Sequence, residues 1–302
     1  MSDPTGRLRR WTRLSALAAL STYALIVLGG IVRITGSGLG CGDDWPLCNG
    51  HLIPPMDLPT LIEYGHRLAA LAVTVLVLAT ALAAWRTKEP EETWVPLRRL
   101  GLAAVLLLAL QILLGAVTVW WELPPASVVL HLGTGMLLLS VLVVGTLRAA
   151  TGREARIRDR TSGWLGWVAA FGFIVVLAGA LVANLDAAPA CQGFPLCNGE
   201  WMPGGGNELI HVHWTHRVVA YALVLVCLGL PWTARRHRPG DGPVRAAALW
   251  AAALALAQLV GAAVMILGGL RMGWRALHMG LGAAVFVALV ALAWLGSRER
   301  AA

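Results

Sequence analysis

Four histidines lie inside long apolar segments of the chain: His66, His131, His216 and His278. A titratable side chain within such a segment is costly, so by default it indicates function. Imidazole binds iron through one ring nitrogen, and facing helices of a bundle can hold a flat porphyrin between two imidazoles. The four residues therefore predict two haem sites, one formed by His66 with His131 and the other by His216 with His278.

Two other interpretations of these histidines stay open. A single histidine in an apolar helix more often makes an interhelical hydrogen bond, although four at similar depth favour iron. A zinc or copper site needs three or four nitrogen or sulfur ligands close together. His211, His213 and His216 could supply them with His278, whereas in the first half only His51 could supplement the pair. Zinc is therefore the weaker interpretation.

One carboxylate accompanies a histidine on the same helix face. Glu63 lies three residues before His66, and His213 occupies the corresponding place before His216. A carboxylate at the edge of the membrane is expensive, and burial beside a ligand tunes such groups for proton chemistry. The alternative is that Glu63 only complements the dipole of the first helical turn. We favour the catalytic interpretation of Glu63.

Several arginines near the histidines are candidates for binding haem propionates. Arg67 and Arg217 each follow a histidine by one position, and Arg271 and Arg275 closely precede His278. We assign Arg217 and Arg275 to this role because guanidinium groups bind carboxylates well. Snorkelling of the side chain to the membrane interface is the alternative for Arg67 and Arg217.

The elements that position these residues are membrane-spanning helices. The 302 residues are 58% hydrophobic and 13% charged, with a mean hydropathy of +0.70, which a soluble domain of this size does not match. Apolar runs of about 20 residues, the length that crosses a bilayer, recur along the chain. The expected spans are 12–34, 62–86, 98–120, 127–149, 163–184, 211–233, 245–268 and 274–296. We predict an all-α integral membrane protein.

The chain is a tandem repeat. The segment 45–50 (WPLCNG) returns as 194–199 (FPLCNG), and the histidine motifs return in the same order. Gln111 and Gln258, each twenty residues before a histidine, also recur and predict interhelical hydrogen bonds. The sequence therefore predicts two pseudo-symmetric four-helix bundles, residues 1–155 and 156–302, which run in the same direction through the membrane.

The charge distribution predicts the orientation of the chain. The formal net charge is +8, and 19 of the 24 Lys and Arg residues lie in alternate loops or at the termini. This positive-inside bias places both termini in the cytoplasm and makes nucleic-acid binding a poor explanation of the charge. The first apolar segment is too long for a cleaved signal peptide, and no mitochondrial presequence precedes it. We expect a multi-pass protein of the bacterial plasma membrane.

Four of the five cysteines form pairs in the two long outer loops, Cys41 with Cys48 and Cys191 with Cys197. The outer face of a bacterial membrane is oxidising, so two short-loop disulfides are expected. Free thiols or a shared zinc site remain alternatives. Cys227, in the middle of a helix, is expected only to pack.

Taken together, these motifs resemble the haem A synthase family over essentially the whole chain. The resemblance rests on the Glu63-x-x-His66-Arg67 motif, the two outer-loop motifs, the motifs at His131 and His278, and the glycine-rich run 30–38. It implies oxidation of the C8 methyl group of haem O to a formyl group, giving haem A for cytochrome oxidase biogenesis. It further implies haem O synthase and the oxidase assembly machinery as partners, and it leaves homo-oligomerisation open.

The resemblance also implies that the two halves bind different haems. His216 and His278 would ligate a haem b cofactor in the C-terminal half. His66 and His131 would frame the substrate haem O in the N-terminal half, with Glu63 as the catalytic carboxylate. A di-haem, quinol-linked electron-transfer protein and a haem-handling transporter remain the alternative classes.

Overall fold

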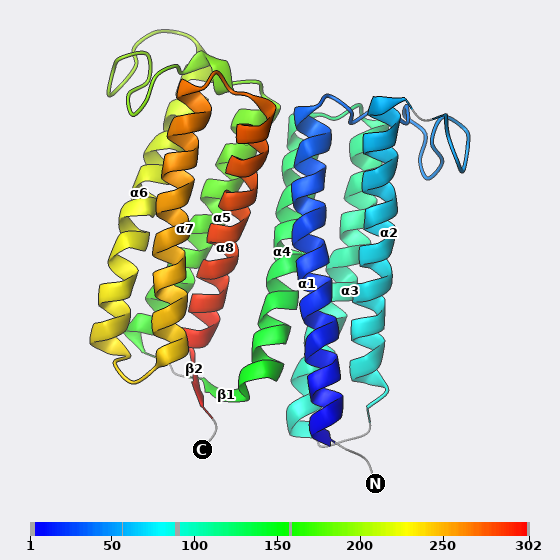
Figure 1. Cartoon of the computed structure of the whole chain (residues 1–302), viewed down its shortest axis with the longest axis vertical. Coiled ribbons are helices and arrows are strands. Elements are labelled where there is room, and N and C mark those ends of the chain that lie inside the picture. The colour runs from blue at the N-terminus through cyan, green and yellow to red at the C-terminus, as the bar shows by residue number, and fades with distance from the viewer. Residues whose placement is uncertain (1–3, 56, 88–90, 157–158, 301–302) are drawn as a thin grey trace. The chain divides into compact units, whose positions relative to one another are not determined.

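Eight long helices dominate the computed structural model (Figure 1). The structure describes residues 4–55, 57–87, 91–156 and 159–300. The elements are α1 (Pro4–Ile34), α2 (Leu58–Trp85), α3 (Glu91–Trp120), α4 (Pro125–Thr151), β1 (Arg153–Arg156), α5 (Arg160–Asn184), the 3-10 helix η1 (Ala188–Ala190), α6 (Glu208–His237), α7 (Gly242–Leu267), α8 (Met272–Gly296) and β2 (Arg298–Arg300). All eight long helices are apolar enough to cross a membrane, which confirms the predicted spans. Lys88 and Arg158, two of the predicted loop cations, lie outside the described residues.

Two helices that carry histidines, α2 and α6, begin earlier than the apolar runs indicate, because polar residues cap them. Asp57 is the N-cap of α2, and its carboxylate accepts a hydrogen bond from the Thr60 backbone N–H at 2.8 Å. Asn207 caps α6 by accepting a bond from the Leu209 N–H at 3.0 Å. These caps fix the turns that carry Glu63 and its counterpart in the second repeat.

The chain divides into two compact units, Met1–Ala155 with Glu299–Ala302, and Arg156–Arg298. In the first unit, α1 and α3 each pack against both α2 and α4. In the second unit, α5 and α7 each pack against both α6 and α8. The helices that carry the histidines are therefore diagonal neighbours in each bundle, and their histidines can face each other across its interior. The short strands β1 and β2 form a two-stranded sheet that the sequence pattern did not predict.

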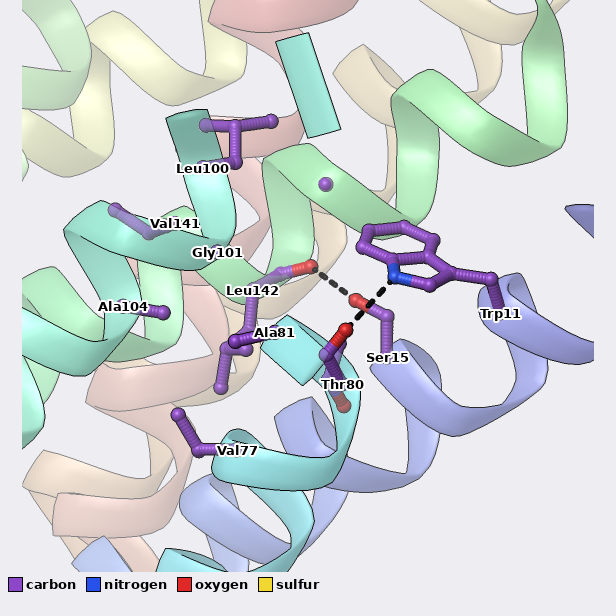
Figure 2. Close-up of a pocket in the computed structure, with 11 residues that line it drawn as sticks. Trp11, Ser15, Val77, Thr80, Ala81, Leu100, Gly101, Ala104, Val141 and Leu142 are labelled. Carbon is purple, nitrogen blue, oxygen red and sulfur yellow. Dashed lines mark hydrogen bonds between the residues drawn. The ribbon is translucent and has the colours of Figure 1, made fainter. Parts of the chain in front are cut away.

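The end of the first bundle that lies away from the histidines is filled by packing (Figure 2). Trp11 is buried there, and its Nε1 donates to the Thr80 carbonyl at 3.0 Å. Ser15 Oγ donates to the Leu142 carbonyl at 3.3 Å. The cavity beside them has room for little more than one water molecule and is mostly apolar. Glu63, His66 and His131 lie toward the opposite end of this bundle, near the starts of α2 and α4.

Candidate functional site

The four histidines occupy matching places in their helices. His66 and His216 each lie eight residues after the first residue of α2 and α6. His131 and His278 each lie six residues after the first residue of α4 and α8. At 1.5 Å per residue these positions are roughly 12 Å and 9 Å inside the helix start. The histidines are therefore about two turns deep, which is two to four residues deeper than the apolar runs predict.

All four imidazoles point into the protein. Within the described residues, the Nδ1 atom of each of the four rings is buried without a hydrogen-bond partner. In each unit the two histidines stand on diagonally opposite helices, His66 with His131 and His216 with His278. A buried polar atom normally has a partner. Paired imidazoles with an unpartnered nitrogen across a bundle interior fit the donor set of a haem iron.

Glycines pack directly against three of the rings. A methyl group at Gly29 of α1 would lie 3.1 Å from His66 Cε1, and one at Gly179 of α5 would lie 2.8 Å from His216 Cε1. A methyl group at Gly115 of α3 would lie 3.1 Å from the Cε1 of His131. Gly29 and Gly179 thus make room for the imidazoles. Sequence reasoning missed Gly115, whose only signal is its place four residues after Gln111.

Two glutamines bind the histidines of the fourth helix in each unit. Gln111 Nε2 lies 3.2 Å from His131 Nε2, and Gln258 Nε2 lies 3.3 Å from His278 Nε2. The sequence predicts interhelical hydrogen bonds for both residues, and the structure directs them to the candidate ligands. Each glutamine also leaves its Oε1 buried without a partner. Both amides therefore position a candidate ligand from the neighbouring helix.

Glu63 is buried, with only 4% of its surface exposed, and connects α2 to the first outer loop. Its Oε2 accepts a hydrogen bond from the Cys41 backbone N–H at 2.8 Å, and its Oε1 pairs with Arg67 Nη2 at 2.5 Å. Arg67 Nη1 in turn donates to the carbonyls of Asp44 and Leu47. Glu63 and Arg67 together hold the disulfide loop against the helix that carries His66.

His213 and Arg217 do the same for the second loop. His213 Nδ1 lies 3.2 Å from the Ala187 carbonyl, and Arg217 Nε donates to His213 Nε2 at 3.3 Å. Arg217 also donates to the carbonyls of Gly193, Leu196 and Cys191, at 2.8, 2.7 and 2.5 Å. Four of the five guanidinium N–H groups are therefore engaged, three with loop carbonyls and one with His213 of the same helix. A propionate role for Arg217 stays a prediction that rests on the remaining donor.

Arg275 is placed differently. It lies in the first turn of α8, three residues before His278 on the same helix face, and it is partly exposed. Arg275 thus lies between the candidate ligand His278 and the end of the bundle. Its position suits binding of a carboxylate better than the position of Arg217, whose donors are mostly engaged.

The outer loops are closed by the two predicted disulfides, Cys41–Cys48 and Cys191–Cys197, while Cys227 is a free, buried thiol. An isolated antiparallel β-bridge follows each disulfide along the chain. These β-bridges pair Cys48 with His51 and Cys197 with Glu200. The peptide bonds Trp45–Pro46 and Phe194–Pro195 are both cis. The two loops thus share one local construction.

The zinc alternative finds no support in the described part of the chain. There, no group of three or more His, Cys, Asp or Glu side chains is arranged to hold a metal ion. The His211 ring makes a contact with the Gly205 carbonyl at 3.0 Å, and the loop cysteines are consumed by disulfides. The paired histidines are left as the candidate ligands.

The fold and the site define a polytopic helical membrane protein that carries a diagonal pair of partly buried histidines near one end of each bundle. The chain belongs to the cytochrome oxidase assembly protein family, whose pattern it matches over residues 12–290. It is similar to the heme A synthase of Shouchella clausii, at 36% identity over 236 residues, which cover 75% of this chain and 77% of that protein. It is also similar to the heme A synthase of Symbiobacterium thermophilum, at 34% identity over 282 residues, covering 89% and 90%. The heme A synthase of Bacillus cereus (strain ATCC 14579) is 28% identical, with 97% of this chain and 95% of that protein covered.

Proposed function

We propose that the protein is a haem A synthase, an oxidoreductase that converts the C8 methyl group of haem O into a formyl group. The observation that carries the proposal is the set of four histidines in diagonal pairs, each with a buried ring nitrogen that has no hydrogen-bond partner. This set occurs in a chain whose relatives, at 34–36% identity, are haem A synthases.

The second unit is proposed to hold haem b as the resident cofactor. His216 and His278 would hold its iron through their imidazoles, Gln258 would orient His278, and Arg275 is the first candidate partner for a propionate. Arg217 is the second candidate, through its one remaining N–H. When bound, a haem with two histidine ligands supplies electron transfer rather than oxygen activation, because its iron has no open position. No carboxylate takes the place of Glu63 here, since that position is His213.

The first unit is proposed to hold the substrate. His66 and His131 frame haem O, and Gln111 orients His131. Oxidation of a methyl group to a formyl group removes four electrons and releases protons, so a proton acceptor is needed near the substrate. Glu63 is that group in our proposal, because it lies one turn from His66 and is buried. Arg67 and the Cys41 N–H fix its carboxylate in place.

The cellular setting follows from the same family. We place the protein in a bacterial plasma membrane with both termini in the cytoplasm, as its loop charges indicate. Haem O synthase is the proposed donor of the substrate. The proposed recipient of haem A is the assembly machinery of cytochrome oxidase, in keeping with the family description.

The test is to express the full chain together with a haem O synthase and to analyse the extracted haems by chromatography. We expect haem A to accumulate only when both proteins are present. Two bound haems without any haem A would instead indicate a di-haem electron carrier. A purified protein without stoichiometric haem would indicate a transporter.

A further inference from the structure

Each outer loop exposes an adjacent pair of large apolar side chains. Leu52 and Ile53 are each 79% exposed in the first loop, and Trp201 and Met202 are 77% and 74% exposed in the second. The two pairs stand at the same repeat position, 149 residues apart, like the loop motifs before them. Large apolar side chains rarely gather on a surface that meets only water. The repetition of the feature indicates a common partner.

The backbone beneath each pair is fastened to a spanning helix. Tyr64 Oη of α2 donates to the Leu52 carbonyl at 2.7 Å, and Trp214 Nε1 of α6 donates to the Trp201 carbonyl at 2.7 Å. Tyr64 and Trp214 also correspond in the two repeats. These bonds hold each tip at the level of the second helical turn, close to the depth of the candidate ligands. Each tip is therefore a fixed feature rather than the end of a loose loop.

Within each unit, the long loop lies on the far side of α2 or α6 from the unit's other helices (Figure 1). In Figure 1, the long loop of each unit extends beyond α2 or α6 and turns back along that helix. The neighbouring face of α2 is itself apolar and open, since Leu58 is 68% exposed and Leu61 is 50% exposed. On a membrane-spanning helix this face contacts lipid. The exposed pair of the first loop thus continues a lipid-facing surface.

We propose that both loop tips insert their apolar side chains into the membrane leaflet on the histidine side. The partner is the phospholipid of the same bilayer, at the boundary between head groups and acyl chains, where tryptophan is usually enriched. Residues 52–53 and 201–202 anchor the outer loops to this boundary. This anchoring would act together with the hydrogen bonds by which Arg67 and Arg217 hold the same two loops. The inference concerns a lipid contact and does not depend on the enzymatic activity.

The test uses the full-length protein in nanodiscs of phosphatidylcholine and phosphatidylglycerol that contain a lipid with a diazirine in its acyl chain. After irradiation, mass spectrometry of peptides locates the lipid adducts. We expect adducts at residues 52–53 and 201–202 in yields similar to that of Leu61, and several-fold above those of the exposed polar residues Asp43 and Asp44. Adducts that are confined to the helices would overturn the proposal.

A paired variant separates side-chain insertion from mere nearness to the bilayer. In Leu52→Ser/Ile53→Ser we expect the adducts in the first loop to fall to the level of the polar controls, while those at 201–202 persist. The reciprocal variant, Trp201→Ser/Met202→Ser, should give the opposite pattern. Each unaltered loop serves as the control for folding and for lipid labelling. Unchanged labelling at the altered tip would contradict insertion by these side chains.

Discussion

Glu63 and His213 occupy equivalent places in the two repeats, and both connect their helix to the outer loop. Glu63 binds the Cys41 N–H and Arg67, while His213 binds the Ala187 carbonyl and Arg217. Holding the loop therefore does not require a carboxylate at this position. What Glu63 adds is a buried group that can accept a proton one turn from His66. This difference is the chemical asymmetry on which our assignment of catalysis to the first unit rests.

We expect Glu63→Gln to retain the haem of the second unit and to lose haem A. Glutamine can still accept the bond from the Cys41 N–H, but it cannot take up a proton. General acid–base groups typically contribute about 10²–10⁴-fold, so product should nearly vanish in a cellular assay. Extracted haems are measured alongside the absorbance of the purified protein. His213→Gln is the matched control, which disturbs the same loop position and should still make haem A. Wild-type levels of haem A in Glu63→Gln would leave the residue a structural role only.

The glycines beside the rings give a second prediction at this scale. A methyl group at Gly179 would lie 2.8 Å from His216 Cε1, too close unless the ring moves. Overpacking of this kind costs about 1–3 kcal/mol. We expect Gly179→Ala to weaken or shift the low-spin absorbance of the purified protein. Gly166→Ala on the same helix has open space around the new methyl group and should leave the spectrum unchanged. An unaltered spectrum in Gly179→Ala would show that the ring has room to spare.

The type and spacing of single residues were enough to predict the histidine pairs and the carboxylate at Glu63. The partners of these residues were not predictable, because they lie far away in the sequence. Cys41 precedes Glu63 by 22 residues, and nothing local to either indicates that a backbone N–H meets the carboxylate. Gly115 was missed for the same reason, since its contact with His131 depends on how α3 packs on α4. The propionate assignment of Arg217 likewise could not anticipate that the loop engages most of its donors.

At the scale of the element, each outer loop is held by one arginine that donates to its backbone carbonyls. We expect Arg217→Lys to loosen the loop that contains Cys191 and Cys197, because an ammonium cannot reproduce a planar fork of donors. Each buried carbonyl left without a partner costs about 1–3 kcal/mol. Hydrogen exchange of residues 191–201, measured by mass spectrometry, should become faster. Arg235→Lys is an exposed control at the other end of α6 and should not change it. Unchanged exchange together with loss of haem would favour the propionate role instead.

The number and type of the helices were predicted correctly, since eight apolar runs of bilayer length leave few alternatives. The residues at which the helices begin were not predicted correctly. The run that begins at 62 belongs to a helix that begins at Leu58, because Asp57 caps it by accepting a hydrogen bond from a backbone N–H of the first turn. The Thr60 N–H bond to Asp57 holds the pKa of that carboxyl below its usual value. The additional turn moves His66 deeper than the apolar run alone indicates.

At the scale of the whole molecule, the two units are proposed to have different tasks, and spectroscopy can separate them. We expect His216→Met and His278→Met each to abolish or shift the low-spin haem that survives purification without substrate. His66→Met and His131→Met should keep that haem and lose haem A production. The histidine placements are equivalent in the two units, so the four variants are matched controls for one another. Loss of the resident haem only from the His66 and His131 variants would reverse the assignment of the halves.

The orientation of the chain gives the last prediction. Basic side chains such as Arg86, Arg148 and Arg235 lie at the helix ends away from the disulfide loops, and such ends face the cytoplasm. The same orientation exposes the disulfides to the oxidising side of the membrane, where they persist. Green fluorescent protein fused after residue 302 should therefore fluoresce, and alkaline phosphatase at that site should be inactive. A fusion at Gly269, after seven of the eight helices, should give the reverse result and serves as the control. An active phosphatase at the C-terminus would place the disulfide loops in a reducing compartment, which neither the charges nor the cysteines support.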